Sequence, residues 1–198
     1  MSNQIETQID VTLSERNRVT ALFRGFLAFP ATIFFFAFAP GDETSAFLWL
    51  FLGVGVFLPP VLTIVFRKAY PSYVLSFNES LMGLRTRLLA YLLHLTDEYP
   101  SIEDNDVVSV TFPEVDPKGL NRWLPLVKWF LAIPLYLVGI LYILYAYFLV
   151  VLGWFSILFS GNFPEFCAEG IVGVIAYWNR VVGYALLLVT DEYPTFSL

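Results

Sequence analysis

The chain has 198 residues, of which 58% are hydrophobic and 14% are charged, and its formal net charge is −6. Soluble domains carry about 25% charged residues, so this composition favours a membrane protein over a soluble enzyme or regulator. We expect no nucleic-acid partner, because the basic residues form no stripe outside the apolar segments.

The second half of the chain resembles the first. The sequence Thr-Asp-Glu-Tyr-Pro occurs at residues 96–100 and again at 190–194, and Arg87 and Tyr91 recur 93 positions later as Arg180 and Tyr184. Near the start the spacing is 104 positions, and it pairs Asn17, Arg18, Arg24 and Pro30 with Asn121, Arg122, Lys128 and Pro134. Such self-similarity indicates one unit used twice. We predict two membrane repeats, residues 1–102 and 103–198, with an insertion in the first around residues 39–49.

The predicted fold is an all-α integral membrane protein whose repeats each hold a short strand, a basic helix with a transmembrane hairpin, and an amphipathic interfacial helix. In the first repeat, residues 9–13 alternate as a strand does. The apolar runs 19–38 and 46–66 flank the polar residues 41–45, which predicts a hairpin. Pro30 should kink the first arm, since proline cannot donate a backbone hydrogen bond.

The hairpin has a consequence for topology. It would bring Arg16 and Arg18 to the same side as Arg67 and Lys68. Basic residues beside spans favour the cytoplasmic side, so we expect the N-terminus in the cytoplasm. A cleaved signal peptide fits less well, because the same order of basic and apolar segments recurs in the second repeat.

A helix with a polar stripe is predicted after Pro71 and again after Pro164. The residues of the first stripe recur at steps of three and four: Ser76, Glu79, Gly83, Arg87, Tyr91 and His94. Those of the second are Glu169, Gly173, Ala176, Arg180 and Tyr184. Such helices suit the membrane interface, and small residues let two of them approach closely. We expect the two stripes to pack together around a pseudo-twofold axis.

The second repeat contains a strand at residues 107–112 and an uncharged run at 129–159. As one helix that run would be about 46 Å long, more than the ~30 Å of a hydrocarbon core. Two paths are open for residues 123–159. We favour a tight hairpin near Gly139; the alternative is an interfacial helix up to Pro134 followed by one tilted span.

Ionisable residues in the stripes are the best candidates for specific contacts. An arginine at membrane depth is a functional hypothesis by default, and its fork matches a phosphate or carboxylate. Lipid-headgroup binding or contact between the repeats is therefore possible at six residues: Arg87, Arg180, Tyr91, Tyr184, Glu79 and Glu169. The simpler explanation, which we favour, is that each arginine snorkels or pairs with a glutamate.

We find no set of residues for catalysis, a cofactor or a metal. The adjacent acids of Thr-Asp-Glu-Tyr-Pro rarely converge on one point, so we interpret the motif as a helix stop with a solvated acidic turn. His94 is the only histidine and lacks the partners a metal would need. Cys167, the only cysteine, has no basic neighbour to activate it. We predict that the protein is not an enzyme.

The sequence of residues 120–134, LNRWLPLVKWFLAIP, resembles the opening of a family of bacterial membrane proteins known as domain of unknown function 4389. Further similarities are WFSILFSG at 154–161, NRVV at 179–182 and the closing TDEYP at 190–194. The resemblance extends over residues 107–198, and the first repeat is a divergent version. It implies a bacterial inner-membrane protein and no particular activity.

The most plausible role is non-catalytic: an accessory or scaffold subunit of a larger membrane complex, with membrane lipids and a protein partner or a homo-oligomer as its contacts. Short extramembrane segments motivate this choice. The alternative is a lipid-binding or membrane-shaping protein that uses the paired amphipathic helices. A small transporter or channel ranks last, because the apolar runs offer almost no polar groups.

Overall fold

The computed structural model describes residues 3–38, 57–103 and 105–198. The described elements are β1 (Glu6–Ile9), α1 (Arg18–Leu27), α2 (Phe29–Phe36), α4 (Leu58–Arg67), α5 (Ser72–Leu92), β2 (Val108–Thr111), a 3₁₀ turn (Leu124–Leu126), α6 (Lys128–Leu131), α7 (Ile133–Ser160), α8 (Glu165–Val182) and a π-helix (Gly183–Leu187). The protein is mostly helical, but it is not all-α, because the two strands form a small sheet.

The sheet joins the two halves of the chain. β1 pairs antiparallel with β2, from Glu6 opposite Thr111 to Ile9 opposite Val108. The strand predicted at residues 107–112 is confirmed, whereas the first strand lies earlier than the predicted 9–13. Burial alternates along both strands, so the sheet exposes one polar side. The exposed residues are Glu6, Gln8, Ser109 and Thr111.

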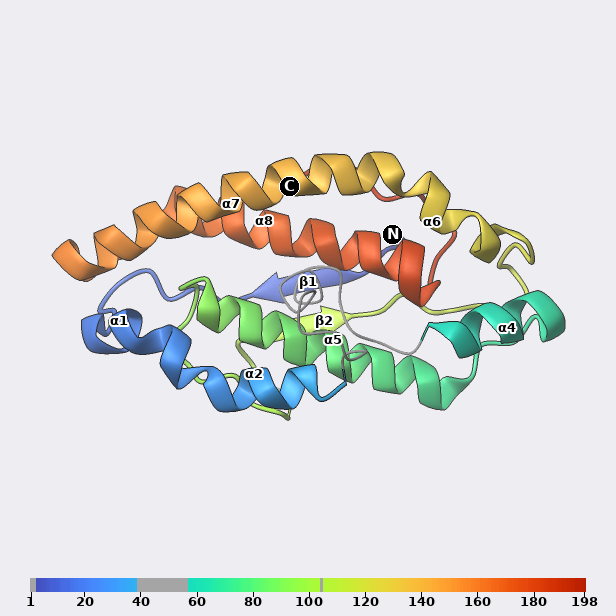
Figure 1. Cartoon of the computed structure of the whole chain (residues 1–198), viewed down its shortest axis with the longest axis horizontal. Helices are drawn as coiled ribbons and strands as arrows, with labels where there is room; N and C mark the ends of the chain where they lie inside the picture. The colour runs from blue at the N-terminus through green and yellow to red at the C-terminus, as the bar shows by residue number, and fades with distance from the viewer. Residues whose placement is uncertain (1–2, 39–56, 104) are drawn as a thin grey trace.

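The long helices run side by side along the longest axis of the molecule (Figure 1). α7 packs along α8, the sheet lies between α8 and α5, and α2 packs against α5. α5 is the most enclosed helix, since all of residues 81–91 are buried. α7 is much more exposed, because it is buried along a single stripe: Leu135, Gly139, Ala146, Leu149, Gly153 and Ile157.

Proline interrupts the helices as predicted. α1 ends at Leu27, α2 begins at Phe29, and Pro30 lies in the first turn of α2. The same break separates α6 from α7, where Pro134 lies in the first turn. Proline suits this position because the first amides of a helix have no partner within it. Ala28 and Ala132 occupy the two breaks and are fully buried.

The hairpin predicted near Gly139 is wrong, because α7 is one continuous helix of 28 residues. The alternative path, a short helix before Pro134 followed by one long helix, is the one observed. At about 1.5 Å per residue α7 is about 42 Å long. Gly139 marks a close approach: a Cβ there would lie 2.5 Å from the Trp178 ring of α8.

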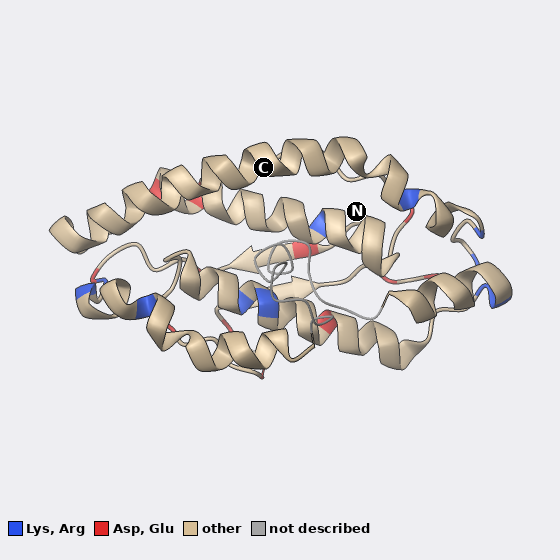
Figure 2. Cartoon of the chain, in the orientation of Figure 1, with Lys and Arg blue, Asp and Glu red and all other residues tan. Residues whose placement is uncertain are grey.

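In the first half, the described helices α1 and α4 do not lie side by side, as the two arms of the predicted hairpin would (Figure 1). The turn at 41–45 and residues 46–56 of the second arm lie outside the described residues. α1 and α4 lie at opposite ends of the long axis (Figure 1), and so do the basic residues beside them (Figure 2). Arg16 and Arg18 therefore lie at the opposite end of the long axis from Arg67 and Lys68 (Figure 2).

Three helical stretches of the described chain are long and apolar enough to cross a membrane: Arg18–Phe36, Ile133–Ser160 and Glu165–Leu187. This agrees with the membrane protein that the composition predicts.

Candidate functional site

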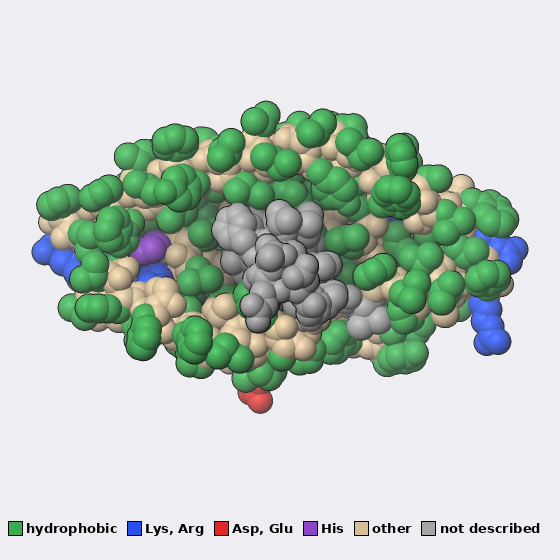
Figure 3. Space-filling model, viewed as in Figure 1, with side chains coloured by type: hydrophobic (Ala, Val, Ile, Leu, Met, Phe, Trp, Pro, Cys, Tyr) green, Lys and Arg blue, Asp and Glu red, His purple; other side chains and the backbone are tan. Residues whose placement is uncertain are grey.

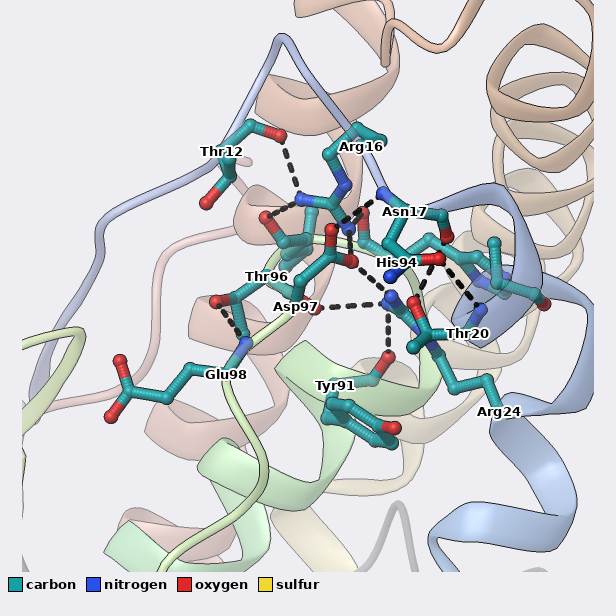
Figure 4. A network of polar contacts seen from close by, with 12 residues as sticks. Thr12, Arg16, Asn17, Thr20, Arg24, Tyr91, His94, Thr96, Asp97 and Glu98 are labelled. Atoms are coloured by element: carbon teal, nitrogen blue, oxygen red, sulfur yellow. Dashed lines mark hydrogen bonds and ion pairs between the residues drawn. The ribbon is translucent and has the colours of Figure 1, made fainter.

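Asp97 is the centre of a buried polar cluster at one end of the molecule (Figure 4). Its carboxylate forms ion pairs with Arg24 and, at 3.0 Å, with Arg16. It also accepts the backbone N–H of Asn17 at 3.0 Å. The Asn17 side chain in turn caps α1 by accepting the N–H of Val19. Asp97 thereby fixes the start of α1.

The two arginines connect this helix start to the end of α5. Arg24 donates to the carbonyl oxygens of Tyr91 at 2.8 Å and Thr96 at 2.9 Å, and its guanidinium lies 4.7 Å from the centre of the Tyr91 ring. Arg16 donates to Leu95 and His94 oxygens, both at 2.9 Å. Arg16 is 4% exposed and Arg24 1%. Such enclosed charges are tolerated only when paired and hydrogen-bonded.

A second cluster with the same contacts surrounds Asp191. Lys128 forms an ion pair with this carboxylate at 2.7 Å and donates to the Thr190 oxygen. The backbone N–H of Asn121 donates to Asp191 at 2.6 Å, as that of Asn17 does to Asp97. The Lys128 ammonium lies 4.9 Å from the centre of the Tyr184 ring. Burial lowers the pKa of Lys128, and Asp191 opposes that shift.

The two clusters differ in charge. The first holds two cations and one anion, whereas the second holds one of each, because the apolar Leu120 stands 104 positions after Arg16. The first cluster therefore carries one uncompensated positive charge among the residues described. The cation–π contact of Arg24 with the Tyr91 ring stabilises that charge, as do the hydrogen bonds from both guanidinium groups to backbone carbonyl oxygens.

These clusters correct our interpretation of the Thr-Asp-Glu-Tyr-Pro motif. The motif does follow the end of a helix, and its glutamates, Glu98 and Glu192, are exposed. The aspartates are instead ion-pair acceptors, each about one-quarter exposed at the side chain. The threonine hydroxyls accept the N–H two residues on, at 3.1 Å in both copies of the motif. The aspartate of each motif thus holds the basic helix of its own half, α1 in the first half and α6 in the second.

The predicted site residues divide between two places. Tyr91 and Tyr184 lie in the aspartate clusters, but Arg87 and Arg180 do not. Arg87 donates to the carbonyl oxygens of Ser101 and Ile102, at 3.0 and 3.2 Å. Arg180 donates to that of Ser197. Each arginine therefore holds the segment that follows the motif against its helix.

A hollow accompanies each of these arginines. One, of about 280 Å³, lies between α5 and β2 and is lined by Arg87 and Glu79. The other, of about 380 Å³, lies between α8 and β1 and is lined by Arg180 and Glu6. Glu79 accepts the N–H of Phe112 at 3.3 Å, and Glu169 is exposed on α8. The structure thus places Glu79 with Arg87 in one hollow, while Glu169 does not line the other.

The two stripes do not form the contact between α5 and α8 that we predicted. The glycines of each stripe pack against residues of their own half. A Cβ at Gly83 would touch Arg87, and one at Gly173 would touch Leu198. The helices meet instead at Thr86 and Asn179, whose side chains hydrogen-bond at 3.2 Å. Arg85, buried beside them, donates to Asn179. The predicted stripes missed this contact because Arg85, Thr86 and Asn179 were not among their residues.

The principal residues that sequence reasoning missed are Asp97, Asp191, Arg24 and Lys128. A signal for them existed. Each of these charges stands at a corresponding place in both halves of an otherwise apolar chain. The cation near the start of each half and the aspartate near its end could have been predicted to form an ion pair.

His94 lies beside the first cluster, 8% exposed and at φ 66°. Its Nε2 lies 3.4 Å from the Ala21 oxygen. Desolvation by burial lowers the pKa of His94 from 6.5 to about 4, and the charge of Arg24 adds to this effect. The imidazole is therefore neutral at pH 7, buried in a pocket with two arginines nearby.

The free energy of unfolding should fall as the pH drops from about 6.5 toward 4. In that range the unfolded chain binds a proton at His94 that the folded chain does not, so low pH favours unfolding, by up to about 3 kcal/mol. The measurement is the midpoint of urea unfolding in mild detergent against pH. Leucine occupies a similar left-handed position at Leu188, φ 60°, so His94→Leu is a suitable control and should flatten this part of the profile. An unchanged slope in that variant would contradict the assignment.

The described residues contain no group of three His, Cys, Asp or Glu side chains placed to hold a metal ion. Cys167 is a free thiol, fully buried in the core. The chemistry of the clusters is that of ion pairing and hydrogen bonding to backbone.

Comparison with known families gives one match. Residues 123–197 match the model of a family described as domain of unknown function DUF4389. This agrees with the resemblance found in the sequence and covers α7, α8 and the second cluster's Asp191. No curated protein and no solved structure matches the chain.

Proposed function

We propose that the protein is a non-catalytic membrane protein that binds lipid and shapes the bilayer, in the inner membrane of a bacterium with its N-terminus in the cytoplasm. The observation that carries this proposal is its broad apolar face. Figure 3 shows hydrophobic side chains over most of the described part of one broad side, around the undescribed residues at its centre, with Lys and Arg toward its ends. An exposed apolar surface of this extent marks a membrane or protein contact.

Helices α7, α1 and α2 supply about half of the exposed large apolar side chains of the described residues. α7 contains no charged residue, and its Phe148, Leu137 and Leu141 are more than 60% exposed. Phe26 of α1 is 81% exposed and Phe29 of α2 61%. Transfer of apolar surface out of water is worth about 25 cal/mol per Å², so these faces favour lipid strongly over water.

We also propose that the two halves are copies of one module. The matching aspartate clusters support this, since each pairs a cation, an aspartate and an asparagine amide from corresponding positions. The π-helix supports it as well. Tyr91 and Tyr184 are 93 positions apart, but Thr96 and Thr190 are 94 apart. A π-helix of this kind absorbs one extra residue without breaking the helix.

Phe148→Asp should weaken membrane binding roughly 100-fold, because a carboxylate in hydrocarbon costs about 3 kcal/mol. The measurement is co-flotation with vesicles of phosphatidylethanolamine and phosphatidylglycerol after dilution out of detergent. Thr111→Asp on the polar side of the sheet, outside both hollows, is the matched control and should bind as the unmodified protein does. Equal loss in both variants would show that the apolar face does not direct binding. Electron microscopy of the same vesicles tests bilayer shaping.

The role of Arg87 and Arg180 in headgroup binding is a separate part of this proposal. Both line polar hollows that a phosphate could enter. Alanine at both positions should then reduce binding to phosphatidylglycerol vesicles and leave binding to neutral vesicles unchanged. Equal binding to both kinds of vesicle would assign these arginines to holding the chain segments alone.

An accessory or scaffold subunit is the second candidate function. The specific observation in its favour is that, among the described residues, α7 is buried along one stripe only, so the rest of its surface is available to a partner helix. Purification from native membranes in mild detergent distinguishes the two. A companion protein at fixed stoichiometry favours the subunit, whereas a lone chain or homo-oligomer with bound lipid favours lipid binding.

A further inference from the structure

We infer that the protein lies in the plane of the membrane, within one leaflet, with its broad apolar face among the acyl chains and its sheet toward water. The inference rests on the proposed lipid binding and specifies the surface and the partner: one leaflet of a phospholipid bilayer. It differs from the transmembrane arrangement that the helix lengths alone suggest.

The first argument is the direction of the helices. α7 and α8 run along the longest axis, and Figure 1 is viewed down the shortest axis, so both helices lie parallel to the broad face. A helix with its side chains is about 10 Å across, which fits within the ~15 Å of hydrocarbon that one leaflet provides. α7, at about 42 Å, exceeds the whole hydrocarbon core when it stands upright.

The second argument is the position of the sheet. β1 and β2 lie midway along the longest axis, between α8 and α5 (Figure 1). Their exposed side chains include Glu6 and Gln8. If the long axis stood along the membrane normal, this polar side of the sheet would lie at the centre of the bilayer. A carboxylate at that depth costs several kcal/mol.

The third argument is the asymmetry of the surface. On the apolar face in Figure 3, acidic side chains are visible only at the lower edge. The described chain nevertheless exposes many acids, among them Glu98, Glu103, Asp106 and Glu192. Those acids therefore lie away from this face. An in-plane protein needs one apolar and one polar side, whereas a spanning protein needs an apolar belt on all sides.

The fourth argument is the placement of basic residues. Lys and Arg side chains lie at both ends of the apolar face (Figure 3). In the in-plane arrangement both ends reach the anionic headgroups of the same leaflet, each contact worth about 1 kcal/mol. An upright molecule would place one basic end on the far side of the membrane, against the positive-inside bias.

Single cysteines test the arrangement, with the unmodified protein as background because its only thiol, Cys167, is buried. Ser14→Cys lies near the C-terminal end of α7, where Leu13 accepts the N–H of Phe163. Lys118→Cys lies near the other end, and Ser109→Cys lies on the sheet. A membrane-impermeant maleimide should label all three in inside-out vesicles and none in intact cells. Phe148→Cys should stay unlabelled in both.

Labelling of Ser14→Cys and Lys118→Cys from opposite sides of the membrane would overturn the inference, as would a Ser109→Cys that reacts only after solubilisation. Polarised infrared spectroscopy of the unmodified protein in supported bilayers gives an independent reading. The helix amide dichroism should indicate axes parallel to the membrane, and axes along the normal would contradict it. Failure of the unmodified protein to float with vesicles would instead refute the proposed lipid binding.

Discussion

Replacing Asp97 with alanine is expected to lower the free energy of unfolding by about 3–5 kcal/mol, the usual cost of removing one partner from a buried ion pair. The variant leaves two arginines, 4% and 1% exposed, without their only described carboxylate. It also removes the acceptor for the N–H of Asn17. Urea unfolding in mild detergent, followed by circular dichroism, measures the change.

Two variants make this prediction specific. Glu98→Ala removes the neighbouring, exposed carboxylate and should change stability by less than about 0.5 kcal/mol. Arg24→Lys should be tolerated far better than Asp97→Ala, since a lysine already pairs with the aspartate of the second cluster. If Glu98→Ala and Asp97→Ala destabilise equally, the loss reflects net charge, and the ion pairs of Asp97 do not hold α1 in place.

Gly153→Ala is expected to destabilise the protein by about 1–3 kcal/mol, because it overpacks the contact between α7 and the start of α8. The new Cβ would lie 2.1 Å from the ring of Phe163, which is only 2% exposed and has little room to move. Gly139→Ala should act similarly through Trp178, at 2.5 Å. Thermal unfolding of the detergent-solubilised protein gives the comparison.

Gly25→Ala is the matched control. It places the same methyl group within helix α1, where no heavy atom lies within 4 Å of the Cβ. Alanine is favoured over glycine inside a helix by about 1 kcal/mol, so this variant should be as stable as the unmodified protein or more stable. A loss of stability at Gly25 matching that at Gly153 would mean that packing is not the cause.

Local patterns in the sequence predicted much of the fold. The polar stripes located α5 and α8, and alternation located β2 to within one or two residues. Pro30 and Pro134 marked both helix breaks. These features depend on a residue and its near neighbours, which is why one sequence suffices to find them.

The errors concern features that depend on distant residues. Gly139 was taken as a bend because glycine permits one, but its role depends on Trp178, 39 positions later. The aspartates were taken as solvated because their partners lie about 60 to 80 positions upstream. The pairing of β1 with β2 across the two halves is a choice among partners that alternation cannot make.

Contacts between the N-terminal segment and the second half of the chain constrain how the protein folds during synthesis. The N–H of Arg16 is held by Gly161, and the strand at Glu6–Ile9 is paired with a strand about 100 residues later. Such non-local contacts form slowly, since a long loop must close first. The N-terminal segment must therefore wait for the second half to leave the ribosome. During that interval the unpaired strand Glu6–Ile9 is open to chaperones or to another copy of the chain.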